Sequence, residues 1–547
     1  MYYYFQQDGS AYTDGYLRFS QGGKEYDYFF QENGAAFTNG YKEVTIGGNV
    51  YYFYFLANGQ SFKTGYKTVN IDGKKYYFYF DQNGRALVNT IQAISLGNRT
   101  AYYLFETDGK AFTAGYKEVP VNGGKDYYYF LANGQAFTGG YKTVKIDGTT
   151  YYFFFEKDGK AFTCGRKDIT FGTNSYTYHF QSNGRAYSNT KVLENGVWCY
   201  YQENGRLRNG LQQVDGKTYY FLQGVPQTGL IAANGKHYYF EANGEMIADK
   251  VISIGHAKYK FGPDGAQVPM TLQEIGKTTN GHHTFVYNYT DDILMYYNGN
   301  LYDTLYPAST TKTLTCAIAL QILNPDEVIT LGNELQMCEY SSSKAYLPAG
   351  GKITVKDLTA AVMVPSGSDA AWAIAYHAGR KLTAGQNLTK MQTVQAFLDE
   401  LNRRGKEMGL VHTNFTAPDG FPDYDGDEIP DSNHYTCMAD MIKIASLAVS
   451  TPTLYEVAGK AEYRWSTPGY ITQVWDTCVP FLATYSKYYD PNVTGLKTGT
   501  STPAGCCILV TVVYEGKTFI IGTFGSKQTD GRFQDVCMLR DLFVYGK

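Results

Sequence analysis

The chain has 547 residues, with 48 Lys or Arg, 51 Asp or Glu, and a formal net charge of -3. This length exceeds what one hydrophobic core supports, so we expect at least two domains. The balanced charge provides no broad positive field, which excludes nucleic acid as an expected partner. No apolar stretch is long enough to span a bilayer.

The first part of the chain is a repeat array. Asx-Gly dipeptides recur every 25 residues up to Asn183-Gly184, and further glycines then follow at intervals of 19 to 21 residues. In each unit an aromatic run such as 51–55 precedes the dipeptide, and a short segment such as 61–66 follows it. Asn-Gly between two β-prone runs is a strong hairpin signal, because both turn residues accept positive φ. We therefore predict an all-β solenoid of about twelve stacked hairpin units over residues 1–266.

The Tyr-Tyr-Phe, Asn-Gly and Thr-Gly-Tyr strings of this array resemble the cell-wall-binding and glucan-binding repeats of bacterial surface proteins and clostridial toxins. The resemblance implies an extracellular, cell-wall-associated protein whose repeats bind a cell-wall polysaccharide or the choline of teichoic acids. Trp is the best cation–π partner for choline, and Trp198 is the only Trp before residue 267, so we favour polysaccharide. The alternative is a purely structural spacer. The chain starts without a secretory signal, and we expect that one was removed.

A linker is expected at 267–282, before a segment of different composition at 283–547. The pattern of that segment predicts two strands in 283–297, a helix over 307–323, a mostly helical stretch over 355–449, strands at 496–499, 507–514 and 518–524, and a last helix over 533–545. Strands from both ends with helices between them predict an α/β domain, in which a helical lobe packs on one sheet.

The strongest chemical signal is Ser309, three positions before Lys312 at the start of an apolar helix. This spacing places the hydroxyl and the amine on one face of the helix, one turn apart. The amine can then take the proton of the hydroxyl and activate it as a nucleophile. The same Ser-x-x-Lys spacing recurs at Ser341 and Lys344, but in a polar loop with no apolar helix behind it, so we discount that copy.

Two further strings, Ser366-Gly367-Ser368 and Lys497-Thr498-Gly499, follow Ser309 in the order that marks penicillin-binding proteins and serine β-lactamases. Together with their flanks, 306–312, 365–371 and 495–500, they resemble the low-molecular-weight D-alanyl-D-alanine carboxypeptidases. The resemblance covers residues 280–547 and implies the penicillin-binding-protein fold, with an antiparallel sheet. It also implies a serine peptidase that trims peptidoglycan stem peptides through an acyl-enzyme and that β-lactam antibiotics inhibit covalently.

The same resemblance assigns roles to individual residues. Ser309 would be the nucleophile, Lys312 the general base, and Ser366 the relay that carries the proton to the leaving amine. Burial beside Lys497 would keep Lys312 neutral, and the backbone N–H groups of Ser309 and Thr500 would form the oxyanion hole. The substrate-binding residues would be Ser368, Lys497, Thr498, Gly499 and Thr500. Transfer of the acyl group to an amine instead of water would make a transpeptidase, and the sequence leaves both outcomes open.

The middle string departs from the family at Ser368, where asparagine is usual. In the family that amide contacts the substrate carbonyl and helps to hold the lysine, whereas a serine hydroxyl is shorter and needs a bridging water. The alternative function is therefore a weakened or inactive homologue that acts as a cell-wall or glycan-binding protein. A β-lactamase is disfavoured, because Leu398 stands where the glutamate that activates the deacylating water belongs.

The sequence predicts no cofactor and no metal site. Its nine cysteines form no Cys-x-x-Cys pair, and its eight histidines form no His-x-x-x-His pair. The acidic run at 423–431 has oxygen ligands at alternate positions, but Glu428 and His434 break the EF-hand pattern. We interpret this run as a hydrated loop.

Overall fold

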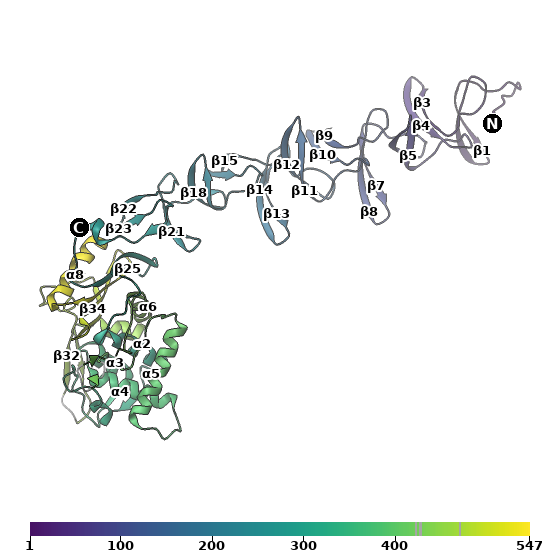
Figure 1. The fold of residues 1–547 in the computed structure, drawn as a ribbon. Helices are drawn as coiled ribbons and strands as arrows, with labels where there is room; N and C mark the ends of the chain where they lie inside the picture. The colour runs from purple at the N-terminus through teal and green to yellow at the C-terminus, as the bar shows by residue number, and fades with distance from the viewer. Residues whose placement is uncertain (422–423, 426–428, 431, 470–471) are drawn as a thin grey trace. The chain divides into compact units, whose positions relative to one another are not determined.

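The computed structural model describes residues 1–421, 424–425, 429–430, 432–469 and 472–547 (Figure 1). Within these residues the chain divides into two compact units, Met1–Gln227 and Thr228–Lys547. The acidic run at 423–431 lies largely outside the described residues, so the hydrated loop stays a prediction. No helix in the described part of the chain is long and apolar enough to cross a lipid bilayer.

The first unit is a series of antiparallel hairpins, which confirms the predicted all-β repeat fold (Figure 1). In chain order the pairs are β1 (Gly15–Gln21) and β2 (Lys24–Phe30), β3 (Gly40–Ile46) and β4 (Asn49–Phe55), β5 (Gly65–Ile71) and β6 (Lys74–Phe80), β7 (Thr90–Leu96) and β8 (Arg99–Phe105), β9 (Gly115–Val121) and β10 (Gly124–Phe130), β11 (Gly140–Ile146) and β12 (Thr149–Phe155), β13 (Gly165–Phe171) and β14 (Asn174–Phe180), and β15 (Thr190–Glu194) and β16 (Val197–Tyr201). The last sheet of this unit has three strands, β17 (Gly210–Val214), β18 (Lys217–Leu222) and β19 (Val225–Pro226).

The Asn-Gly dipeptides close a smaller element than the hairpin that the sequence predicts. The two long strands β3 and β4 are joined by Gly47 and Gly48, both at positive φ. The dipeptide Asn58-Gly59 comes after β4 and closes only the single bridge between Phe55 and Ser61. The ladder stops there because the chain turns away at Thr64, whose φ is +49°. Each repeat therefore contains two tight turns.

Neighbouring hairpins are joined by backbone hydrogen bonds and by aromatic packing. The segment after β6 reaches back to the preceding hairpin, where Ala86 N donates to Tyr52 O at 2.8 Å. Tyr41 of one hairpin packs on Phe78 of the next, with ring centroids 4.9 Å apart. A single hairpin is marginally stable in water. Stacking supplies the buried surface that it lacks and leaves residues such as Phe80 fully buried.

The second unit begins with the last repeats of the array. These are β20 (Gly229–Ala233) and β21 (Lys236–Phe240), then β22 (Lys250–Ile254), β23 (Ala257–Phe261) and β24 (Gln267–Val268). Residues 267–282, the predicted linker, contain β24 and the short helix α1 (Leu272–Ile275). Tyr259 and Phe261 belong to the same buried cluster as the C-terminal sheet. The last repeats are thus part of the core of the second unit.

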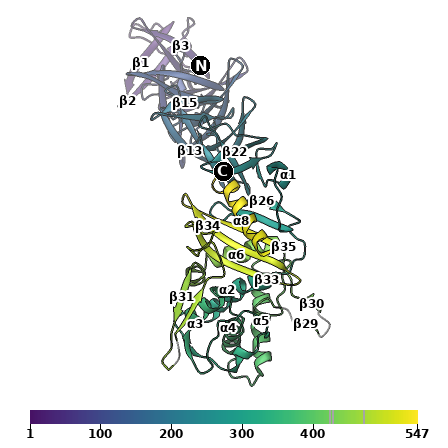
Figure 2. The ribbon, with the colours of Figure 1, turned by 90° about the vertical axis from the view of Figure 1, so that its left-hand side faces the viewer.

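One five-stranded antiparallel sheet organises the second unit and confirms the prediction that strands from both ends combine (Figure 2). The strand order is β26 (Ile293–Asn298), β25 (His283–Asn288), β35 (Lys517–Ser526), β34 (Gly505–Tyr514) and β33 (Val493–Ser501). Side chains alternate between its faces. Phe285 and Leu509 point to the helical lobe, whereas Val286 and Val510 pack with α8 (Thr529–Phe543).

The helical lobe is formed by the chain between the two parts of the sheet. Its helices are the 3-10 turn η1 (Ala308–Thr311), α2 (Lys312–Ile322), the 3-10 turn η2 (Asn333–Gln336), α3 (Val355–Met363), α4 (Ser368–Leu382), α5 (Lys390–Glu407), α6 (Met438–Val449) and α7 (Pro452–Ala458). Short strand pairs flank them, namely β27 (Val328–Thr330) with β28 (Lys352–Thr354), β29 (Tyr424–Asp425) with β30 (Ile429–Pro430), and β31 (Glu462–Trp465) with β32 (Gln473–Asp476). The helix predicted over 307–323 is present, with a 3-10 first turn.

Candidate active site

Ser309 and Lys312 meet at the junction of η1 and α2. Lys312 is fully buried, and its Nζ donates to Ser309 Oγ at 2.8 Å. In a 3-10 turn the side chains at positions i and i+3 are eclipsed, so the turn at Ala308–Thr311 aligns the amine with the hydroxyl. The structure therefore brings the predicted nucleophile and base into direct contact.

Ser366 and Ser368, at the start of α4, complete the polar surroundings of Lys312. Lys312 Nζ donates to Ser368 Oγ at 3.1 Å and to Ser366 Oγ at 3.5 Å. Ser366 has a φ of +64°, an uncommon conformation for a residue with a side chain. Ser343 holds this turn, because its Oγ donates to Ser366 O at 2.5 Å and its carbonyl accepts from Ser368 N at 2.7 Å. The loop of the discounted Ser-x-x-Lys string thus supports the site, and its own lysine, Lys344, donates to Tyr340 O.

The edge strand β33 forms the opposite wall of the site. Gly499 lies so close to η1 that a Cβ there would be 2.9 Å from Pro307 O and 3.0 Å from Ser309 N. A side chain at this position would push the two walls apart. Lys497 is fully buried, and its Nζ donates to Thr498 O at 2.9 Å.

A cavity of about 290 Å³ lies between these walls. Among the predicted site residues, those that line it are Ser309, Ser366, Thr498, Gly499 and Thr500. The other three, Lys312, Ser368 and Lys497, are buried beneath them. The rest of the lining comes from Pro365, Phe421, Cys478 and the discounted loop, which contributes Ser341, Ser342 and Ser343. All three predicted strings therefore converge on one cleft.

Burial of the amine makes Lys312 a usable base. Burial is the main cause that lowers the pKa of Lys312, to about 8. Asp419 opposes this shift and Lys497 adds to it. Burial lowers the pKa of Lys497 as well. A general base works best when its pKa lies near the working pH, which this environment provides for Lys312.

We expect the acylation of Ser309 to become faster as the pH rises through about 8. Only the neutral amine of Lys312 accepts a proton, and its neutral fraction grows above its pKa. The rate constant for covalent modification by a fluorescent penicillin, measured across this range, checks the prediction. A rate that is flat or falls with pH would contradict it.

Arg532 is a functional candidate that sequence analysis missed. It lies in the first turn of α8, and its Nη1 donates to Gly499 O at 2.7 Å, to Cys507 O at 2.9 Å and to Thr500 Oγ1 at 3.0 Å. The guanidinium thereby fixes the end of β33 beside the cavity. No sequence motif around Arg532 predicts this role, because its partners lie on β33 and β34 and are distant from it in sequence.

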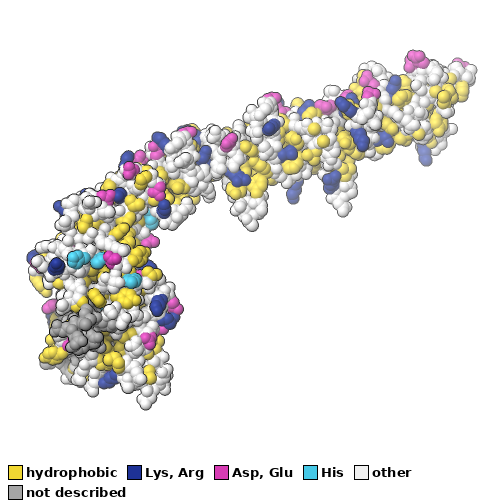
Figure 3. All heavy atoms as spheres, viewed as in Figure 1, with side chains coloured by type: hydrophobic (Ala, Val, Ile, Leu, Met, Phe, Trp, Pro, Cys, Tyr) yellow, Lys and Arg dark blue, Asp and Glu magenta, His cyan; other side chains and the backbone are white. Residues whose placement is uncertain are grey.

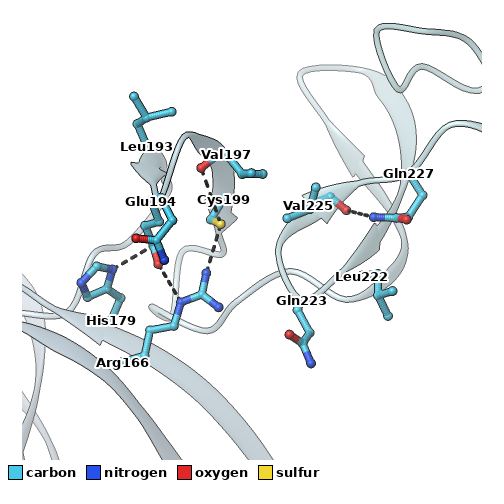
Figure 4. A pocket seen from close by; sticks show the side chains of 11 residues that line it. Arg166, His179, Leu193, Glu194, Val197, Cys199, Leu222, Gln223, Val225 and Gln227 are labelled. Carbon is cyan, nitrogen blue, oxygen red and sulfur yellow. Dashed lines mark hydrogen bonds and ion pairs between the residues drawn. The ribbon is translucent and has the colours of Figure 1, made fainter.

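A larger hollow of about 980 Å³ lies in the repeat unit, over the hairpins from β13 to β19 (Figure 4). On one side Glu194 pairs with Arg166 at 2.6 Å and with His179 at 2.9 Å. The other side carries amide and apolar groups, including Gln223 and Gln227 (Figure 4).

Comparison with known proteins gives two family matches. The family described as D-alanyl-D-alanine carboxypeptidase matches residues 272–528. The family described as putative cell wall binding repeat matches residues 209–223 and 228–246.

Three relatives illustrate the match. The D-alanyl-D-alanine carboxypeptidase of Streptomyces sp. (strain K15) is 30% identical over 226 residues, which cover 39% of this chain and 70% of that protein. D-alanyl-D-alanine carboxypeptidase DacF of Bacillus subtilis (strain 168) is 25% identical over 252 residues, or 45% of this chain and 58% of that protein. The crystal structure of the Streptomyces K15 DD-transpeptidase has a TM-score of 0.43 and 25% identity, and covers 49% of this chain and 98% of that one.

Proposed function

Because the chain belongs to the D-alanyl-D-alanine carboxypeptidase family, we propose that it removes the terminal D-alanine from peptidoglycan stem peptides. The observation that carries this proposal is the nitrogen of Lys312, which lies 2.8 Å from Ser309 Oγ and also contacts Ser366 and Ser368. A buried amine in contact with a hydroxyl that lines a cavity is the arrangement that nucleophilic catalysis by serine requires.

In the proposed reaction, neutral Lys312 takes the proton of Ser309 while Oγ attacks the carbonyl carbon between the last two D-alanines. The backbone N–H groups of Ser309 and Thr500 hold the oxyanion, each with an effect of about 3 kcal/mol. Ser366 then passes the proton from Lys312 to the leaving nitrogen, and D-alanine departs. Water hydrolyses the ester on Ser309 and restores the free enzyme.

The terminal carboxylate of the substrate is proposed to bind along β33. The hydroxyls of Thr498 and Thr500 line the cavity, and Lys497 supplies positive charge from beneath the strand. Arg532 keeps Thr500 in place through the bond to its Oγ1. Charge-assisted contacts of this kind are stronger than those between neutral groups.

A synthetic peptide that ends in D-Ala-D-Ala tests the proposal, with release of D-alanine as the measurement. Release in water supports the carboxypeptidase, and a new amide product in the presence of an amine acceptor indicates transpeptidation. Rapid turnover of penicillin would indicate a β-lactamase. A protein that neither releases D-alanine nor becomes labelled by penicillin would be an inactive, wall-binding homologue.

We further propose that residues 1–266 hold the enzyme on the bacterial cell wall, outside the cell. The match of two of its segments to the cell wall binding repeat supports this role. The substrate is an immobile polymer, so tethering raises the local concentration of enzyme without any new contact in the active site.

We propose polysaccharide rather than choline as the ligand of the 25-residue repeats. The aromatic slots, which are the pairs of rings on which choline would bind, are already occupied by lysine side chains of the chain itself. Lys67 Nζ lies 4.4 Å from the ring centroid of Tyr54 and 4.9 Å from that of Phe62. The same arrangement recurs at Lys42, Lys142 and Lys167, each over two rings. Figure 3 shows lysine and arginine side chains among the hydrophobic ones along this unit. An ammonium over aromatic faces makes the contact that choline would make.

Choline is therefore expected to leave the thermal unfolding temperature of the protein unchanged. Replacement of Lys67 and Lys142 by alanine empties two slots, and we expect choline to stabilise that variant. Each lost cation–π contact costs about 0.5–1 kcal/mol. Lys75, exposed in β6, provides the matched control, because Lys75→Ala empties no slot. Stabilisation of the unchanged protein by choline would contradict the assignment.

A further inference from the structure

A buried carboxylate, Asp419, acts electrostatically on the amine of Lys312 and takes no part in the proposed reaction. Asp419 is 1% exposed, and its charge acts on Lys312 more strongly than that of any other residue. Its Oδ1 accepts from Phe421 N at 3.2 Å. Its Oδ2 is buried without a hydrogen-bond partner among the described residues. Such an unpaired buried oxygen is costly unless it has an electrostatic role.

The backbone around Asp419 is pressed against the turn that carries Ser309. Pro418 O accepts from Thr315 Oγ1 of α2 at 2.7 Å. Gly420 has a φ of +77°, and a Cβ there would be 1.9 Å from Ala308 O. Both contacts fix the carboxyl group relative to η1 and α2, so its place next to Lys312 is built into the fold.

The charges that act most strongly on Lys312 come from four groups on different elements. They are Asp419 from the segment after α5, Lys497 from β33, Cys478 from the segment after β32, and Asp369 from α4. Asp369 has other partners, since its Oδ1 accepts from Ala345 N at 2.8 Å. Asp419 is thus the acidic group that is free to balance the ammonium.

Ser368 contacts the amine, and its hydroxyl proton is available to the unfilled Oδ2 of Asp419. The three N–H donors of an ammonium match the three hydroxyls of Ser309, Ser366 and Ser368 that Lys312 contacts. The Ser368 hydroxyl accepts from Lys312, so its own proton is free to be donated. Burial raises the pKa of Asp419, while the charge of Lys312 and the hydrogen bond from Phe421 N oppose that shift.

We propose that Asp419 is a positioning residue that balances the charge of Lys312 and holds its amine through the hydroxyl of Ser368. This inference rests on the proposed acyl-enzyme chemistry. It also explains how the site tolerates serine at the position where the family has asparagine. The carboxyl group supplies the polar partner that the missing amide would have supplied.

The test is the pH profile of penicillin acylation in Asp419→Asn. The amide keeps the size of the carboxyl group and its contact with Phe421 N, but removes the negative charge that stabilises the ammonium. The midpoint of the rising limb is expected to move to lower pH by about one unit. A merely structural role would lower the rate at every pH and leave the midpoint in place.

A double-mutant cycle tests the part played by Ser368. If Lys312, Ser368 and Asp419 form one chain, Ser368→Ala and Asp419→Asn each break it. The fold-reduction of the maximal acylation rate in the double variant is then smaller than the product of the fold-reductions in the two single variants. Independent losses, or an unchanged midpoint in Asp419→Asn, would overturn the proposal.

Asp440 provides the matched control, because it is a buried carboxylate that accepts from His412 N at 2.7 Å and is not among the groups whose charges act most strongly on Lys312. Asp440→Asn is expected to destabilise the fold without moving the midpoint of the pH profile.

Thermal unfolding gives a second test of Asp419→Asn that needs no catalysis. The deficit of Asp419→Asn should grow as the pH falls from about 9 to about 6, because an unbalanced ammonium must then be buried. A pH-independent deficit would overturn the proposal even if the protein does not react with penicillin.

Discussion

Replacement of Ser309 by alanine is expected to abolish covalent labelling of the protein by a fluorescent penicillin. In the proposed reaction the acyl-enzyme bond forms to Ser309 Oγ, so removal of that oxygen leaves no atom to carry the covalent label. Ser366 also lines the cavity, but its Oγ lies 3.5 Å from Lys312 Nζ, against 2.8 Å for Ser309. The measurement is in-gel fluorescence after denaturation, which retains only covalent label.

The chain contains its own control for this experiment in the second Ser-x-x-Lys string. Ser341→Ala removes a serine that has the same spacing to a lysine and lines the same cavity, and this variant should still become labelled. Labelling of Ser309→Ala, or its loss in Ser341→Ala alone, would show that the nucleophile has been assigned to the wrong string. Thermal unfolding of both variants would establish that the fold is intact.

The second large effect is expected for Lys312→Met, which removes the base but retains an unbranched side chain. General base catalysis contributes about 10²–10⁴ to the rate, so acylation should slow by that factor while Ser309 remains in place. The residual reaction should no longer accelerate as the pH rises through about 8, because the group whose pKa lies there is absent. Stopped-flow or quenched labelling with penicillin measures both properties.

Lys344→Met is the matched control for this variant. Lys344 Nζ donates to Tyr340 O at 2.9 Å in the polar loop and has no contact with Ser309 among the described residues. The variant should retain both the acylation rate and its pH dependence to within a few-fold. An equal loss in Lys312→Met and Lys344→Met would contradict the assigned base.

The sequence could predict the site where local spacing decides the geometry. Ser309 and Lys312 are one helical turn apart, so the chain itself brings them together, and the three strings appear in one order. The strands and helices of the second unit also follow from their apolar patterns. Asp419 and Arg532 could not be found in this way. Each touches its partners only because a loop or a helix packs against a distant segment.

The repeats show the same limit in another form. The 25-residue period is plain in the sequence, but each repeat has two dipeptides that both predict a tight turn, such as Gly47-Gly48 and Asn58-Gly59. Only the ladder shows which of them joins the long strands. Likewise Lys67 and its counterparts recur with the period, yet the direction of their ammonium groups depends on neighbouring hairpins.

The buried cluster shared by the last repeats and the C-terminal sheet limits how this protein can be divided. Tyr259 and Phe261 are core residues of the catalytic fold, and His256 pairs with Glu515 at 2.6 Å. A gene fragment cut at the compositional boundary near residue 283 would strip this apolar surface from the enzyme. A recombination event that exchanges wall-binding repeats between such proteins would keep this core intact only if the crossover lay before Thr228. The final hairpins would then stay with the peptidase.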